Sequence, residues 1–282
     1  MEWPADNSYR AVRDWLIGFT TEDNRESEAI VRTLLEWQTG KSRATLLSGD
    51  HRFTESALNR LKEAALRLQK GTPVQHVTGE AWFYGRRFQV GPQVLIPRPE
   101  TEELIALLLP KLNGRKRLLD VGTGSGCIAV TFALEAPFLL VDGWDVSVEA
   151  LALAQSNAST LGASVHFKHQ DVFTAEVVLP FDVLVSNPPY IGLEEADSLE
   201  TKVREHEPAL ALFVNEHPLE FYRFMVAKFP AWLSPDGIFG FECHSRYADD
   251  VLQLCRAAGC QELELHTDAQ GLARMVIGRR QP

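Results

Sequence analysis

The sequence Asn187-Pro188-Pro189-Tyr190 combines residue types that could hold a planar nitrogen group. It follows residues 181–186, an apolar segment of strand character with a single acid. Prolines cannot donate a backbone hydrogen bond, so this stiff corner presents acceptors, namely the side-chain oxygen of Asn187 and the carbonyl oxygen of Pro188. Tyr190 can pack against the plane of a conjugated group. The carboxyl end of such a strand is where ligands bind in open α/β sheets.

These acceptors suit group transfer to a conjugated nitrogen. An amide or aniline-type nitrogen is a poor nucleophile because its lone pair is delocalised into a π-system. Two acceptors that hold its N–H groups favour a more tetrahedral nitrogen, and they bind more strongly as positive charge develops on it. Proximity to the donor adds to the rate, and the cationic product loses a proton without a strong base. We therefore predict Asn187, Pro188, Pro189 and Tyr190 as catalytic residues.

A glycine-rich loop upstream of this motif predicts a cofactor site. Residues 118–121 read as a buried strand that runs into Gly122-Thr123-Gly124-Ser125-Gly126 and then into a helix. Glycines let the backbone turn sharply and approach a ligand closely. Cys127 stands where the third glycine of a dinucleotide-binding loop is expected, and no Gly-Lys-Ser/Thr sequence follows. The loop therefore indicates a nucleotide-like cofactor without a pyrophosphate.

Two acidic residues follow the next strands. Asp145 ends the second strand, where a carboxylate can accept both hydroxyls of a ribose. Asp171 and Val172 follow the third strand, where an adenine edge would lie. The alternative for each acid is a structural one, a helix cap or a solvated loop charge. A ribose without a pyrophosphate points to S-adenosylmethionine, the methyl donor that yields S-adenosylhomocysteine. The candidate cofactor-binding residues are Gly122, Thr123, Gly124, Ser125, Gly126, Asp145, Asp171, Val172 and Asn187.

Hydrophobic periodicity predicts the elements that position these residues. Apolar residues recur at helical spacing through residues 9–70, which predicts a small helical bundle. From residue 115 onward, apolar runs of strand length alternate with helical stretches. The strand-like runs are residues 118–121, 139–144, 165–169, 183–185, 238–242, 263–266 and 275–277. The last two leave no room for a helix between them and are predicted to form an antiparallel hairpin.

The predicted fold class is α/β, a doubly wound, mostly parallel seven-stranded sheet with a small all-α N-terminal domain. We expect the helical bundle over residues 1–73, a β-hairpin linker over 74–96 and the cofactor-binding domain over 97–282. Prolines on both sides of Arg98 predict an extended turn before a helix. Arg98 and Glu100 could line the mouth of the site or lock the linker to the sheet.

Composition and charge narrow the class of protein. Hydrophobic residues make up 45% and charged residues 23% of the 282 residues, as in folded globular proteins. The formal net charge of -10 arises beyond residue 90, where acids outnumber bases, and such a surface is a poor partner for a phosphate backbone. The chain shows no signal peptide, membrane span or clustered Cys and His ligands for a metal. We expect a cytoplasmic monomer that binds neither membrane nor nucleic acid directly.

Blocks over nearly the whole chain resemble the release factor glutamine methyltransferases, the protein-(glutamine-N5) methyltransferases of bacterial translation termination. The block at residues 94–102, which reads VLIPRPETE, is the most specific. The others lie at residues 71–76, 79–80, 120–127, 185–191 and 207–210. The resemblance implies methylation of the glutamine in the Gly-Gly-Gln loop of a peptide chain release factor, with Asn187, Pro188 and Tyr190 holding the amide. It also implies that the helical bundle helps to dock the release factor.

Two features depart from the pattern of that family. Residues 213–218 read FVNEHP where a Gly-Gly…Asp-Gly segment is usual, and Val172 stands where an aromatic residue is common. An alternative is a nucleic-acid adenine or cytosine amino-methyltransferase, which shares the Asn-Pro-Pro-Tyr motif but needs a base-flipping surface. A non-catalytic binding module is a further alternative, although it would not need the motif intact.

Overall fold

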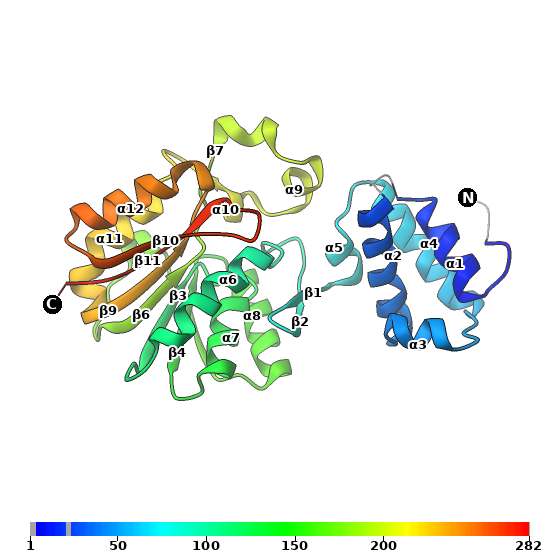
Figure 1. Ribbon diagram of the computed structural model, residues 1–282, viewed down its shortest axis with the longest axis horizontal. Helices are drawn as coiled ribbons and strands as arrows, with labels where there is room; N and C mark the ends of the chain where they lie inside the picture. The colour runs from blue at the N-terminus through cyan, green and yellow to red at the C-terminus, as the bar shows by residue number, and fades with distance from the viewer. Residues whose placement is uncertain (1–3, 21–23, 282) are drawn as a thin grey trace. The chain divides into compact units, whose positions relative to one another are not determined.

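The chain forms two compact units, and the computed structural model describes residues 4–20 and 24–281 (Figure 1). Unit 1 comprises Met1–Glu80 and Glu200–His206, and unit 2 comprises Ala81–Leu199 and Glu207–Pro282. A short segment from the later part of the chain therefore belongs to the N-terminal unit. No helix in the described ranges combines the length and the apolar character that crossing a membrane requires.

Unit 1 is helical. Its helices are α1 (Tyr9–Ile17), α2 (Asn24–Thr39), α3 (Arg43–Ser48), α4 (Glu55–Gln69), α5 (Val74–Thr78) and α9 (Thr201–His206). Ser8, Ser42 and Thr54 cap α1, α3 and α4, because each side-chain oxygen accepts from a backbone N–H of the first turn. The structure differs from the expected hairpin linker at its start, because residues 74–78 form α5. Gly79, with φ 74°, ends that helix in the left-handed conformation that glycine favours.

A two-stranded hairpin follows, made of β1 (Glu80–Phe83) and β2 (Arg86–Gln89). Tyr84 and Gly85 form its turn, both with positive φ. The rings of Phe83 and Phe88 meet edge to face with centroids 5.9 Å apart. Both rings belong to an apolar core of unit 2, so the hairpin is anchored to that unit by aromatic burial.

Unit 2 is built on a seven-stranded sheet with the order β10-β11-β9-β6-β3-β4-β5. The strands are β3 (Arg117–Val121), β4 (Leu140–Asp145), β5 (Val165–His169), β6 (Phe181–Ser186), β9 (Leu233–Glu242), β10 (Gln261–Thr267) and β11 (Ala273–Arg279). The five strands from β9 to β5 pair in parallel, whereas β11 pairs antiparallel with β9 and β10. The predicted fold class is confirmed, including the antiparallel hairpin at the edge.

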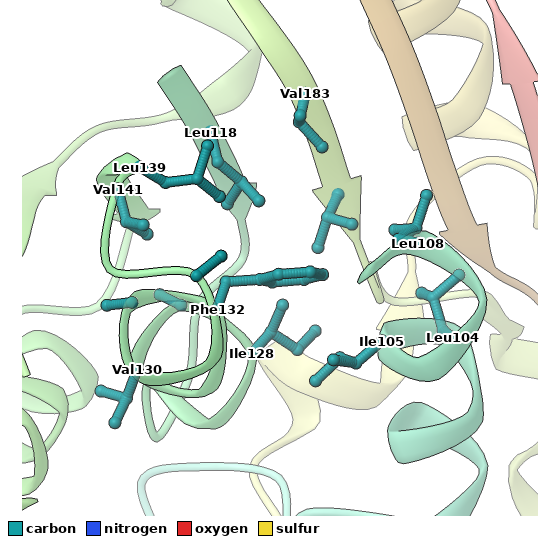
Figure 2. Close-up of a cluster of buried hydrophobic side chains, with 14 of the residues drawn as sticks. Leu104, Ile105, Leu108, Leu118, Ile128, Val130, Phe132, Leu139, Val141 and Val183 are labelled. Atoms are coloured by element: carbon teal, nitrogen blue, oxygen red, sulfur yellow. The ribbon is translucent and has the colours of Figure 1, made fainter. Parts of the chain in front are cut away.

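Helices cover both faces of this sheet (Figure 1). One layer contains α6 (Pro99–Leu108), α7 (Cys127–Glu135) and α8 (Val148–Leu161), and the other contains α11 (Glu220–Trp232) and α12 (Ala248–Ala257). Successive residues of a strand face opposite layers. Leu118 of β3 thus joins the apolar cluster with α6 and α7 that Figure 2 shows, and Leu119 joins the cluster with α11 and α12. The central strands are buried on both faces.

The remaining elements of unit 2 are short. They are η1 (Leu109–Lys111), η2 (Val172–Thr174), β7 (Ile191–Gly192), η3 (Leu193–Ser198), α10 (Ala209–Leu212), β8 (Phe213–Val214) and η4 (Ser245–Tyr247). β7 and β8 pair in parallel, with Ile191 opposite Phe213. This pairing holds the segment that follows Tyr190 beside residues 213–214.

A substitution at Gly126 tests how tightly the glycine loop is packed against α8. It has φ 79°, and a Cβ there would meet the Cβ of Ala154 at 3.0 Å, whereas Gly162, with φ 73°, has nothing within 4 Å. We expect Gly126→Ala to lower the free energy of unfolding by roughly 1–3 kcal/mol more than the control Gly162→Ala, because only Gly126 adds overpacking to the strain of a positive φ. Urea unfolding of both variants measures the difference, and equal losses would contradict this packing.

Because the carboxylate of Asp120 in β3 is buried, we predict that the stability of the protein depends on pH. This carboxylate is 0% exposed, and burial raises the pKa from 3.8 to about 7 despite hydrogen bonds from Thr123 and Ala129. A raised pKa contributes stability that is present below about pH 4 and is lost as the pH rises through about 7. The free energy of unfolding of the wild type, minus that of Asp120→Asn, should therefore fall between pH 5 and 8, by up to about 1.4 kcal/mol per pH unit. A difference that stayed constant or rose would contradict the burial argument.

Candidate functional site

A cavity of about 460 Å³ lies in unit 2 where β3, β4, β5 and β6 end. This is the edge at which an open α/β sheet binds ligands, and the volume suits a small-molecule cofactor. Of the residues proposed from the sequence, those that line the cavity are Gly122, Thr123, Gly124, Ser125, Asp145, Asp171, Val172, Asn187, Pro188 and Pro189. Gly126 and Tyr190 are not among its lining residues.

The glycine loop uses its own amides to hold its shape. The N–H groups of Gly122 and Thr123 both donate to the carbonyl oxygen of Trp144, each at 2.9 Å. The Gly124 N–H donates to Asp145 Oδ2 at 2.8 Å. Because these donors are already engaged, the loop forms a close wall of the cavity rather than a cradle for phosphate oxygens. This geometry agrees with a cofactor that carries no pyrophosphate.

Asp145 links the loop to the end of β4. Its Oδ2 accepts from Gly124 N and its Oδ1 accepts from Ser147 N at 2.9 Å. Burial raises the pKa of Asp145, and these backbone hydrogen bonds oppose the shift. Each carboxylate oxygen retains a second lone pair, which can accept a hydroxyl from a ligand in the cavity. The residue therefore has both a structural role and the chemistry to hold a ribose.

Asp171 and Val172 lie on the next part of the cavity wall. Asp171 caps η2, because its Oδ1 accepts from Phe173 N at 2.9 Å, so the structural alternative applies to it as well. Phe173 and Phe221 also line the cavity, with ring centroids 4.9 Å apart. These rings can supply the aromatic surface that Val172 lacks. The sequence motifs gave no sign of Phe221, which reaches the site from α11.

Asn187 stands at the end of β6 in a fixed orientation. Its Nδ2 donates to Thr101 Oγ1 at 3.3 Å, and the Thr101 hydroxyl donates to Glu242 Oε2 at 2.5 Å. Pro188 is buried and Pro189 is half-buried next to it. Thr101 lies within the block at residues 94–102, but its type and spacing alone assigned it no role. Glu242 ends β9 and was not singled out either.

Tyr190 lies behind this corner. Its ring meets His244 edge to face with centroids 5.9 Å apart, and it packs against the apolar cluster with α11 and α12. Burial raises the pKa of Tyr190 well above its usual value, so its hydroxyl stays neutral. In this structure the ring supports the corner from outside the cavity lining.

Arg98 lines the cavity, which is one of the two roles considered for it. Its guanidinium pairs with Glu207 Oε1 at 2.5 Å, so its partner lies in a loop and not in the sheet. The other oxygen of Glu207 accepts from the backbone N–H of Ile96 at 3.1 Å. Glu207 is only 6% exposed, so this pairing ties the turn before α6 to the segment before α10. Glu100 does not line the cavity and accepts from Gln270 Nε2 at 3.5 Å.

The segment that departs from the family's pattern also forms part of the wall. Phe213, Val214 and Asn215 line the cavity. Among the described residues, no three His, Cys, Asp or Glu side chains gather as metal ligands would. The cavity thus combines a close glycine wall, a carboxylate with spare lone pairs, aromatic rings and an acceptor corner. That set fits a nucleoside with a charged tail, as S-adenosylmethionine is.

Comparison with known proteins identifies the family. Residues 15–79 match the model of the PrmC N-terminal domain, and residues 101–205 match the methyltransferase small domain. The release factor glutamine methyltransferase of Bacteroides thetaiotaomicron is 42% identical over 223 residues, which are 78% of this chain and 80% of that protein. The enzyme of the same name from Bacillus subtilis is 37% identical over 93% of this chain and 94% of its own length.

Solved structures add evidence on the fold alone. A methyltransferase from Pyrococcus furiosus superposes with a TM-score of 0.53 at 15% identity, over 81% of this chain and all of that one (100%). Identity that low carries no argument on substrate, whereas the sequence relatives match along most of both chains. The chain belongs to the release factor glutamine methyltransferase family.

Proposed function

We propose that the protein transfers a methyl group from S-adenosylmethionine to the side-chain amide nitrogen of the glutamine in the Gly-Gly-Gln loop of peptide chain release factors. The observation that carries the proposal is the acceptor corner at Asn187 and Pro188 on the same cavity as the glycine loop. Membership of the family supports the choice of a protein amide as the acceptor of the methyl group.

Each residue of the corner has a distinct role in this proposal. Asn187 Oδ1 and the carbonyl oxygen of Pro188 accept the two N–H groups of the glutamine amide, which turns its lone pair toward the donor. Pro189 stiffens the corner, and Tyr190 holds it from behind. When bound, S-adenosylmethionine supplies an electrophilic methyl group. The acceptors interact more strongly as the nitrogen becomes cationic, so they lower the barrier rather than merely bind substrate.

The cofactor is proposed to lie along the glycine loop. Gly122, Thr123, Gly124 and Ser125 form the wall that it approaches, with Gly126 behind them, Asp145 accepts from its ribose, and Asp171 with Val172 borders its adenine. Asn187 lies where the two ligands meet. Phe173 and Phe221 add apolar surface that the sequence motifs did not include.

The proposal extends to domains and partners. We assign residues 1–73 to a bundle that helps to dock the release factor, 74–96 to a linker and 97–282 to the methyltransferase domain. The protein is proposed to act as a cytoplasmic monomer with no direct nucleic-acid contact. A nucleobase amine could meet the same two acceptors, but the acidic balance of the chain beyond residue 90 disfavours a polyanion.

The activity is tested by incubating the purified protein with a release factor and S-adenosylmethionine labelled in its methyl group. We expect label to appear on the Gly-Gly-Gln glutamine, which mass spectrometry of the digested factor locates. A release factor with that glutamine changed to alanine is the matched control and should take up no label. Transfer that persists in the alanine control would overturn the proposal.

Asn187→Ala separates catalysis from binding. It removes one of two acceptors whose interaction strengthens during the reaction, so kcat should fall by about 100-fold or more, while the dissociation constant of S-adenosylmethionine changes only a few-fold. Single-turnover kinetics and calorimetric titration measure the two quantities. Equal losses in both would mean that Asn187 only holds the loop.

A further inference from the structure

Two consecutive hydrogen bonds run from the cavity into the core behind Asn187. Asn187 Nδ2 lies 3.3 Å from Thr101 Oγ1, which lies 2.5 Å from Glu242 Oε2. Asn187 and Thr101 line the cavity, whereas Glu242 is 2% exposed and is not part of the lining. The three residues come from the end of β6, the first turn of α6 and the end of β9. The two hydrogen bonds therefore connect the helix α6 with the ends of two strands of the sheet.

The chemistry of the three groups sets the direction of both hydrogen bonds. In its ionised form the Glu242 carboxylate has acceptors only, so the single hydroxyl hydrogen of Thr101 is then committed to Glu242, whose Oε2 lies 2.5 Å from Thr101 Oγ1. The Thr101 oxygen can then only accept, and the end of Asn187 that faces it must be the NH2 group. The shape of the side chain alone does not distinguish the oxygen of an amide from its nitrogen, but the direction of these two hydrogen bonds does.

We propose that Thr101 and Glu242 are positioning residues that fix the amide of Asn187 with its oxygen toward the substrate nitrogen, an inference that rests on the proposed function. A flipped Asn187 would point its NH2 group at the N–H groups of the glutamine amide. Two donors facing each other repel, and one acceptor would be lost. Each donor in the series also polarises the next, so the oxygen of Asn187 becomes a stronger acceptor.

The environment of Glu242 keeps this carboxylate in place. The Tyr222 hydroxyl donates to the backbone oxygen of Glu242 at 2.8 Å, which fixes the end of β9. The pKa of Glu242 is raised from 4.5 to about 7, because burial and, to a smaller extent, the charge of Glu100 outweigh Thr101, Arg274 and Arg98, which favour the ionised form. A protonated Glu242 could donate to Thr101 and release the constraint on Asn187. By favouring the ionised form of Glu242, the two arginines and the threonine also favour the orientation of Asn187 in which its oxygen faces the substrate.

The experiment compares Thr101→Val, Thr101→Ser and Glu242→Leu in the methyl-transfer assay and in cofactor titration. Valine has the shape of threonine without the hydroxyl, and leucine removes the acceptor that holds the Thr101 hydroxyl, so both should lower kcat by about 10-fold or more with little change in cofactor affinity. Thr101→Ser keeps the hydroxyl and should stay within about threefold of the wild type. Thr131→Val is the matched control, because Thr131 is fully buried and its hydroxyl has no hydrogen-bond partner.

A second readout does not depend on the substrate. Hydrogen exchange of the Asn187 side-chain NH2, followed by NMR, should be slow in the wild type and Thr101→Ser and fast in Thr101→Val. The same exchange rate in the valine variant would overturn the positioning role, as would a wild-type kcat in Glu242→Leu if Thr101→Val did not fold. A wild-type protein that fails to methylate release factors, yet shows the exchange pattern, would refute the proposed function and leave the orientation of Asn187 supported.

Discussion

The pairing of β3 with β6 is the constraint on which the site depends. These strands lie side by side with Val121 opposite Ser186, and the Ser186 hydroxyl donates to the Val121 carbonyl oxygen at 2.7 Å. The glycine loop begins one residue after β3, and Asn187 comes one residue after β6. A slip of one residue would turn every side chain of either strand to the opposite face. Burial on both faces therefore fixes the distance between the cofactor wall and the acceptor corner.

Three carboxylates, one in the cavity lining and two in the core behind it, lie where burial disfavours the anionic form. Asp120 and Glu242 both have a pKa raised to about 7, and burial raises that of Asp145 as well. Backbone N–H groups or a hydroxyl meet each of them, so the groups that face the cavity are held before any ligand arrives. Polar groups that are already held in place need to rearrange less when positive charge develops on the substrate nitrogen. Burial of these carboxylates lowers the stability of the folded protein, whereas their hydrogen bonds keep the site rigid.

Periodicity and motif spacing were sufficient for the sheet and for bringing most of the proposed site residues to the lining of one cavity. Each strand-like run became a strand, with the central ones buried on two faces and β5 and β10 partly exposed at the edges, and the glycine loop and Asn187 met because parallel strands end at one edge. The partners of those residues could not be predicted in the same way. Thr101 and Glu242 are separated by 141 positions, and only tertiary packing brings them together. Helix α5 also replaced an expected extended segment, because Pro73 and Gly79 bound a single helical turn.

The departure at residues 213–218 is compatible with the proposed chemistry for a structural reason. Phe213 and Val214 pair with Ile191 and Gly192 through backbone groups, which side-chain changes leave intact. That pairing supports the segment after Tyr190, whereas the two acceptors lie before it, at the end of β6. Substitutions in this segment can therefore alter the lining of the cavity without moving Asn187 or the Pro188 carbonyl. The acceptor geometry depends on the sheet and on Thr101, neither of which the segment contributes.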